Sequence, residues 1–245
     1  MSGERILCAE LGVVPYAEAR ELEARIEAAR DDDRIPDVLL ILEHNPVYTK
    51  GRRAKPEELG MGEDWYRMQG IEVCEADRGG GVTYHGPGQL VGYPIVSLQP
   101  YRNDVGDYVA RMERVMVESL GAAGVPAQTI PGLTGVWTEG PPPVADPNPG
   151  AARKIGSIGV HVRRGVTTHG FAINVSNDLQ PFEWVVPCGI EGVAMTSVSR
   201  ELGSEQPLEP FAAIVRERFA AVYERRLIEV PRADLEERLA TEALA

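Results

Sequence analysis

One cysteine of this 245-residue chain lies between a proline and a glycine, at Pro187-Cys188-Gly189, and is therefore expected in a turn. The chain has only three lysines, and one of them, Lys154, leads into an apolar segment. A lysine near a thiol favours the thiolate or accepts its proton, and the thiolate is the nucleophile. Cys188 and Lys154 are therefore candidates for nucleophilic catalysis. Cys8 and Cys74 are interpreted as small buried hydrophobic residues.

A second unusual feature is the segment Arg78–Gln89, which holds five glycines and one proline in twelve positions. Such a segment can be a plain surface turn, but that much backbone freedom opposes folding. Alternatively it is a wall on which a ligand chain lies against the backbone, while Tyr84 and His85 fix the polar end of that ligand. We favour the wall.

Other common site motifs are absent. Gly86, Gly88 and Gly92 are spaced one residue too widely for a dinucleotide loop, and no phosphate-binding Gly-Lys-Ser or Gly-Lys-Thr occurs. Gly156-Ser157-Ile158-Gly159 misses a nucleophile elbow by one position. The four histidines show no metal-helix spacing and are interpreted singly as structural, so we expect no metal: His44, His85, His161 and His169.

Composition narrows the class of protein. The chain has 25 basic and 37 acidic residues and a net charge of −12, which argues against broad binding to nucleic acid or to an anionic membrane. The first thirty residues hold no apolar run long enough for a signal peptide or a membrane span, so we expect a cytoplasmic protein. The length suits one domain over residues 1–245, with a flexible Pro-rich loop at 139–152.

The elements that must position these residues follow from hydrophobic spacing. An amphipathic helix is predicted from Pro15 to Arg30, and the most distinct helix over 104–123, with Asn103 or Asp104 as its cap. Strands are predicted at 38–42, 71–76, 90–98, 135–138 and 227–230, a hairpin at 154–162 and 166–175 joined by Arg163-Arg164-Gly165, and helices at 211–226 and 233–244. Gly92 and Pro94 suggest a bulge or an edge strand. The pattern favours an α/β (α+β-like) fold, a mixed sheet flanked by helices.

Taken together, these motifs resemble those of the lipoyl(octanoyl) transferase family. The resemblance extends from about Leu39 to Leu202 and rests on several motifs in one order: Glu43–Thr49, Arg78–Gln89, Gly135–Trp137, Lys154–Val160, His169-Gly170 and Pro187–Ile190. It implies a fold similar to that of lipoate and biotin protein ligases. It also implies octanoyl transfer from acyl carrier protein to a lysine of lipoyl domains, those of 2-oxoacid dehydrogenase complexes and the glycine cleavage H protein, without a cofactor.

The resemblance also assigns roles to residues. Cys188 would be the acyl-thioester nucleophile, and Lys154 would lower its pKa. The acyl substrate site would be lined by Arg78, Gly79, Gly80, Gly81, Val82, Thr83, Tyr84, His85, Ser157, Ile158, Gly159, Gly170, Phe171 and Ala172.

Three rival functions stay open. An ATP-dependent lipoate ligase of the same fold class would use the lysine on an acyl adenylate, but it needs no Pro-Cys-Gly turn. An acyl-binding adaptor would keep the glycine-rich wall without the chemistry, and a thioesterase would use the same cysteine with water. We further expect a local arginine patch to recruit the acidic carrier, formed by Arg52, Arg53, Arg78, Arg163 and Arg164.

Overall fold

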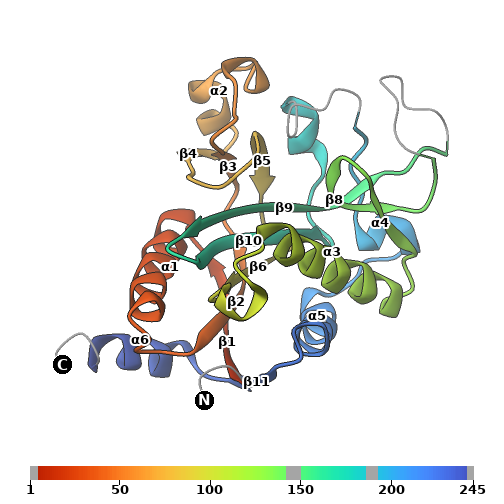
Figure 1. Cartoon of the computed structure of the whole chain (residues 1–245). Coiled ribbons are helices and arrows are strands. Elements are labelled where there is room, and N and C mark those ends of the chain that lie inside the picture. The colour runs from red at the N-terminus through yellow and green to blue at the C-terminus, as the bar shows by residue number, and fades with distance from the viewer. Residues whose placement is uncertain (1–4, 142–149, 186–192, 242–245) are drawn as a thin grey trace.

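The computed structural model describes residues 5–141, 150–185 and 193–241. A large mixed sheet of eight strands runs through the molecule in the order β11-β1-β2-β6-β10-β9-β8-β7. Its first three strands are parallel and the remaining pairings are antiparallel. The predicted mixed sheet with flanking helices is thus confirmed (Figure 1).

The strands of the large sheet are β1 (Arg5–Val14), β2 (Asp37–His44), β6 (Gln89–Ile95), β7 (Ala127–Ile130), β8 (Leu133–Thr138), β9 (Lys154–Arg163), β10 (Val166–Asn174) and β11 (Arg226–Glu229). A smaller sheet pairs β3 (Val47–Lys50) with β4 (Glu72–Glu75) and β5 (Val82–His85), in the order β4-β3-β5. The helices are α1 (Tyr16–Asp31), α2 (Glu63–Met68), α3 (Val105–Ala122), α4 (Val198–Leu202), α5 (Leu208–Tyr223) and α6 (Arg232–Thr241).

Helices cover both faces of the large sheet. Figure 1 shows α1 and α6 on one side and α3 and α5 on the other, with the small sheet and α2 beyond one end. Strand β2 lies between these layers, so alternate residues enter different cores. Leu39 and Ile41 pack in the cluster that includes α3 and α5, whereas Leu40 and Leu42 pack in the cluster that includes α1 and α6.

Local signals account for the elements that flank the cavity described below. Helix α3 begins where its cap was predicted, because the Asp104 side chain accepts a hydrogen bond from the backbone N of Asp107 at 3.1 Å. Helix α1 follows Pro15, and β9 and β10 form the predicted hairpin. The prediction of a bulge or an edge strand is wrong, because β6 pairs without a register shift with β2 and, over Gln89–Gly92, with β10. Pro94 itself pairs only with Leu39 of β2.

None of the helices within the described residues is long and apolar enough to cross a membrane. The predicted helix end at 244 and the central part of the Pro-rich loop lie outside the described residues.

Candidate functional site

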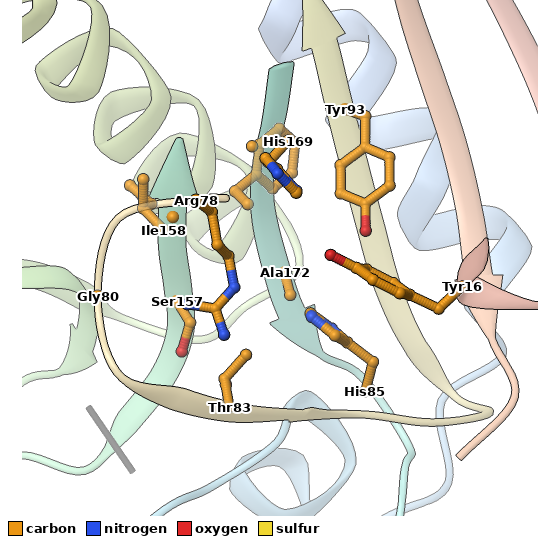
Figure 2. Close-up of a pocket in the computed structure, with 13 residues that line it drawn as sticks. Tyr16, Arg78, Gly80, Thr83, His85, Tyr93, Ser157, Ile158, His169 and Ala172 are labelled. Carbon is orange, nitrogen blue, oxygen red and sulfur yellow. The ribbon is translucent and has the colours of Figure 1, made fainter. Parts of the chain in front are cut away.

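A cavity lies over β6, β9 and β10, between the small sheet and the start of α1 (Figure 2). It contains about 450 Å³ of empty space, including its opening to solvent. Its lining residues are Tyr16, Arg78, Gly80, Thr83, His85, Tyr93, Ser157, Ile158, Gly159, His169, Gly170, Phe171 and Ala172. We call it the central cavity.

Most of the substrate-binding residues predicted from the resemblance meet at this cavity, although they come from three separate segments. Successive side chains of β5 point to opposite faces of the strand. Thr83 and His85 line the cavity, whereas Val82 and Tyr84 pack in the apolar core of the small sheet. Gly79 and Gly81 line a groove beside the cavity instead. The predicted residues of β9 and β10 all line the cavity.

Two glycines let chain segments approach closely around the cavity. A Cβ at Gly159 would lie 2.8 Å from Cδ of Arg78 and 3.2 Å from the carbonyl oxygen of Gly79. A Cβ at Gly92 would overlap the ring of Phe171, which is paired with Gly92 across β6 and β10. Part of the cavity is therefore walled by backbone and by the edge of an aromatic ring, which suits an apolar chain better than a highly polar ligand.

Two buried, neutral histidines support the cavity wall: His85 lines it, and His44 packs against the rings of His85 and Tyr16. Nδ1–H of His85 donates to Oε1 of Gln89 at 2.7 Å, and burial lowers the pKa of His85 well below its usual value. Nδ1–H of His44 donates to the carbonyl oxygen of Val14 at 3.0 Å, and its Nε2 accepts from the Tyr93 hydroxyl at 2.8 Å. Burial lowers the pKa of His44 to about 4.

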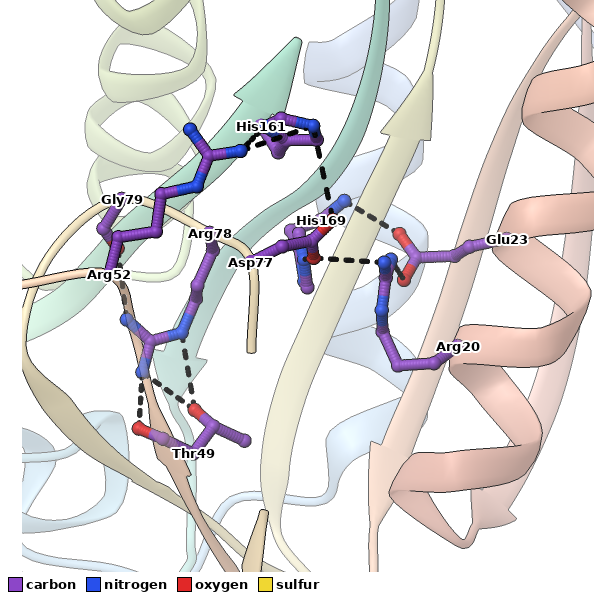
Figure 3. Close-up of polar contacts among 9 residues, drawn as sticks. All are labelled: Arg20, Glu23, Thr49, Arg52, Asp77, Arg78, Gly79, His161 and His169. Carbon is purple, nitrogen blue, oxygen red and sulfur yellow. Dashed lines mark hydrogen bonds and ion pairs between the residues drawn. The ribbon is translucent and has the colours of Figure 1, made fainter. Parts of the chain in front are cut away.

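An ion-paired network joins α1 to the loop that leads into the cavity (Figure 3). Asp77 accepts from Nε2 of His169 at 2.6 Å and from Arg20 at 2.9 Å. The hydrogen bond from His169, assisted by the charge of Arg20, holds the pKa of Asp77 well below its usual range. Glu23, which is fully buried, accepts from Arg20 and from the backbone N of His169, each at 2.6 Å. The network fixes α1 against β10.

Arg78 anchors the glycine-rich loop to β3 while lining the cavity. Its Nη2 donates to the carbonyl oxygen and to Oγ1 of Thr49, each at 2.6 Å, and its Nη1 donates to the carbonyl oxygen of Gly79 at 3.0 Å. The guanidinium is thus held in place by the protein itself (Figure 3). It supplies a fixed positive charge to the cavity wall.

Lys154 lines a groove that adjoins the central cavity. The groove, here the Lys154 groove, is lined by Arg53, Lys55, Glu58, Gly79, Gly80, Gly81, Val109, Gly132, Leu133, Thr134, Lys154, Ile158, Gly159 and Val160. It shares Gly80, Ile158 and Gly159 with the cavity. Lys154 is buried at the start of β9, where Nζ donates to the carbonyl oxygen of Thr134 at 3.2 Å and lies 5.4 Å from the centroid of the Trp137 ring.

Cys188 lies outside the described residues, as do Pro187 and Gly189, but the described chain on either side is held firmly. Before it, the short 3-10 helix Gln180–Trp184 is bound by the hydroxyls of Tyr48 and Tyr66, which donate to backbone carbonyls at 2.6 and 2.9 Å. After it, the backbone N of Lys154 donates to the carbonyl of Ala194, and the backbone N of Thr196 donates to the carbonyl of Lys154, each at 2.9 Å. The chain that leaves Cys188 therefore pairs directly with Lys154.

The other two thiols are unsuited to nucleophilic attack. Cys8 is buried in β1, and burial raises its pKa to about 12. Cys74 is half-buried on β4, and burial, followed by the charge of Glu72, raises its pKa above the usual value. Raised thiol pKa values reduce the thiolate fraction at neutral pH.

Three cavity residues were not predicted as site residues, namely Tyr16, Tyr93 and His169. His169 stood in a recognised motif but was interpreted as structural, and it does hold Asp77. Tyr16 and Tyr93 carry no sequence signal, because only the packing of α1 over β6 brings them to the cavity. Among residues 5–141, 150–185 and 193–241, no group of three or more His, Cys, Asp or Glu side chains is arranged to hold a metal ion.

Comparison with known proteins gives a consistent set of relatives. The family model for the lipoyl protein ligase A/B catalytic domain matches residues 15–220. An octanoyltransferase of Koribacter versatilis is 41% identical over 220 residues, which cover 89% of this chain and 84% of that protein. An octanoyltransferase of Rubrobacter xylanophilus is 45% identical over 199 residues, which cover 80% of this chain and 84% of that protein.

The fold is also found among solved structures. The structure of a bipartite lipoate protein ligase of Thermoplasma acidophilum, from a study of that ligase and its E2 lipoyl domain, superposes with a TM-score of 0.71. The match covers 98% of this chain and 91% of that chain, at 21% sequence identity. At this identity the likeness establishes the fold alone.

Proposed function

Because the chain belongs to the lipoyl protein ligase A/B catalytic domain family, we propose that it is an octanoyltransferase of protein lipoylation. In this proposal it moves an octanoyl group from acyl carrier protein to a lysine amine of a lipoyl domain, through a thioester on Cys188. We also propose that residues 1–245 act as a single catalytic domain. The observation that carries the proposal is the central cavity beside Lys154, whose backbone pairs with the chain that follows Cys188.

Chain geometry is compatible with a Cys188–Lys154 pair. Cys188 precedes Ala194 by six residues, and six residues span at most about 20 Å. Since Ala194 is hydrogen-bonded to Lys154, the thiol is within reach of the Lys154 groove. Gly80, Ile158 and Gly159 form the boundary between this groove and the cavity, so an acyl carbonyl at the boundary would leave its chain free to enter the cavity.

The reaction we propose consists of two acyl transfers. The Cys188 thiolate attacks the carbonyl carbon of the octanoyl thioester, and the carrier's thiolate leaves and takes the proton of the Lys154 ammonium group, which becomes a neutral amine. The amine of the acceptor lysine then attacks the enzyme thioester, the Cys188 thiolate leaves, and the amine proton passes to Lys154. A thioester is already activated, so neither transfer requires a nucleotide.

Much of the cavity lining suits an acyl chain. The lining combines backbone, Ile158, Phe171 and Ala172 with His85, which burial keeps neutral. The donor and acceptor domains remain outside the cavity and present only the thioester or the lysine to the groove.

Replacement of Cys188 by alanine tests the proposal. Mixing the full chain with octanoyl carrier protein should give a covalent octanoyl adduct by intact-mass measurement, and Cys188→Ala should abolish both the adduct and transfer to a lipoyl domain. The thermal unfolding midpoint should stay close to that of the wild type.

Cys74→Ala is the matched control, because it removes a half-buried thiol outside the groove and should retain adduct and transfer. Normal transfer by Cys188→Ala would show that covalent catalysis on this residue is wrong. An absolute requirement for ATP would instead favour a ligase, and rapid release of free octanoate without an acceptor would favour a thioesterase.

A further inference from the structure

Tyr16, the first residue of α1, separates the central cavity from a second hollow on the surface. This outer hollow is lined by Tyr16, Ala17, Arg20, Cys74, Glu75, Ala76 and Asp77. Among the described residues that line either space, Tyr16 alone lines both. Its ring is therefore a partition between the interior of the site and an open face.

Tyr16 lies at the side of the central cavity opposite the Lys154 groove. Figure 2 shows Tyr16 and Tyr93 facing Gly80 and Ile158 across the cavity, and the last two are residues that the cavity shares with the groove. An acyl chain whose carbonyl lies at the Lys154 groove therefore extends toward Tyr16 as it lengthens.

The partition is rigidly backed. Only 4% of Tyr16 is exposed, and its ring meets the edge of the His44 ring at a centroid distance of 5.4 Å and an angle of 69°. His44 is itself held by Val14 and Tyr93. The Tyr16 ring cannot move back without disturbing this set of contacts.

The hydroxyl of Tyr16 adds a polar barrier to the steric one. It is buried, and no described residue forms a hydrogen bond with it. Burial raises the pKa of Tyr16, so the group stays a neutral phenol that still needs a hydrogen-bonding partner. A methylene group packed against Oη would fill the space beside it without supplying that partner, so a longer chain gains less there than against an apolar wall.

We propose that Tyr16 sets the longest acyl chain that the central cavity accepts, by closing the passage to the outer hollow and by opposing burial of further methylene groups against its hydroxyl. This inference rests on the proposed function, since it takes the occupant of the cavity to be an acyl chain. It assigns to Tyr16 a role in specificity and none in the acyl transfer itself.

The test compares acyl chain lengths in the full-length protein. For wild type, Tyr16→Phe and Tyr16→Ala, kcat/KM is measured with octanoyl, decanoyl and dodecanoyl thioesters of the same carrier. Tyr16→Ala should raise the decanoyl-to-octanoyl ratio of kcat/KM by about tenfold or more, because a few methylene groups in an apolar pocket give discrimination of that size. Tyr16→Phe should raise the ratio less, because the ring still blocks the passage, and dodecanoyl transfer should appear only with Tyr16→Ala.

Tyr223→Phe is the matched control. Tyr223 is also buried, and its hydroxyl has no hydrogen-bonding partner among the described residues, but it stacks on Phe219 in the core between α3 and α5, away from the cavity. Tyr223→Phe should leave the decanoyl-to-octanoyl ratio of kcat/KM unchanged. If Tyr16→Ala folds poorly, Tyr16→Leu, which keeps apolar bulk at the start of α1, should still raise the ratio.

An unchanged ratio in Tyr16→Ala, or an equal loss with all three chain lengths, would overturn the inference. Calorimetric measurement of the binding of free octanoate and decanoate distinguishes failure of this inference from failure of the proposed function. If wild type transfers no acyl group but Tyr16→Ala gains affinity for decanoate relative to octanoate, then the transferase proposal fails and the partition stands. If the relative affinity is also unchanged, the partition fails.

Discussion

Lys154 occupies a position where a lysine and an arginine are not equivalent. Its Nζ is buried against the carbonyl oxygen of Thr134 and the ring of Trp137, at the groove that adjoins the cavity. A positive charge at this point favours a nearby thiolate. Only a lysine can also take up and release a proton, since a guanidinium stays protonated. The two roles can therefore be separated by substitution.

We expect Lys154→Arg to impair the second half-reaction more than the first. Acylation of Cys188 needs mainly the charge, whereas transfer to the acceptor amine needs a proton acceptor, and general base catalysis contributes about 10²-fold or more. Single-turnover rates of enzyme acylation and of octanoyl transfer from the acylated enzyme measure the two steps separately.

Lys50→Arg is the control for that comparison, because Lys50 is ion-paired with Glu63 and Glu75 on the small sheet. It should leave both rates unaltered. Equal losses of both rates in Lys154→Arg would mean that Lys154 supplies geometry and charge without proton transfer.

Sequence patterns predicted most of the cavity lining, but they did not predict the side of the cavity that Tyr16 forms. His85 could be selected because a glycine-rich motif surrounds it, whereas Thr83 and Ser157 to Gly159 were selected only through the resemblance to the family. Tyr16 could not be selected, since it reaches the cavity only through the angle at which α1 crosses the sheet. Val82 and Tyr84 were assigned to the acyl site with their neighbours, although strand alternation turns their side chains into the core.

At the scale of elements, the strongest predictions were those with a local cause. Helix α3 has an apolar stripe and an aspartate cap, and the β9–β10 hairpin has a Gly165 turn, so both were predicted close to their observed bounds. Strand β1 was missed because Gly12 interrupts its alternation and its register shifts between Glu10 and Gly12. The four-residue strands β3 and β5 are too short for a periodic signal, and their pairing depends on distant segments.

His44 connects three strands, and its neutrality makes that connection dependent on pH. It lies at the end of β2, donates to Val14 of β1 and accepts from Tyr93 of β6. Its pKa is about 4 in the folded protein and 6.5 in an unperturbed chain. Below pH 6.5 the unfolded chain takes up a proton that the folded protein does not, so the free energy of unfolding falls as the pH decreases toward 4. The loss from this group is roughly 3 kcal/mol.

Replacing His44 by glutamine should remove part of this pH dependence. The variant should be less stable than wild type at pH 7.5, because its contacts with Val14 and Tyr93 are weakened, but it should lose less stability between pH 7.5 and 4.5. Urea unfolding at several pH values provides the measurement. The pKa of His85 is also lowered by burial, so the free energy of unfolding of the variant should still depend on pH to some extent. If the free energy of unfolding depended on pH identically in wild type and His44→Gln, the pH dependence could not be assigned to His44.

At the scale of the whole molecule, the proposed function requires an acidic protein to bind an acidic carrier. The net charge of −12 repels an acidic carrier at long range, so local complementarity has to guide docking. Four arginines of the expected patch are engaged within the chain. Arg78 donates to Thr49 and Gly79, and Arg52 donates to His161 at 2.6 Å. Arg163 pairs with Glu27 at 2.8 Å, and Arg164 pairs with Asp31 at 3.1 Å. Arg53 and Lys55 instead line the Lys154 groove, where the carrier would deliver its thioester in the proposed function.

We therefore expect Arg53 and Lys55 to be the cations that receive the carrier. Raising the salt concentration to 0.15 M should weaken carrier binding, because exposed charges are screened beyond about 8 Å. Replacing both residues by alanine should lower kcat/KM for octanoyl carrier protein relative to that for a small octanoyl thioester, chiefly through slower association, and should flatten the salt dependence. The matched control is the double replacement of Arg163 and Arg164, which removes the same charge at the opposite end of β9, about 30 Å along the strand from Lys154. The control should keep both the ratio and the salt dependence of wild type. If instead the two double variants lose carrier activity equally, the effect is one of net charge, and docking does not depend on the Lys154 groove.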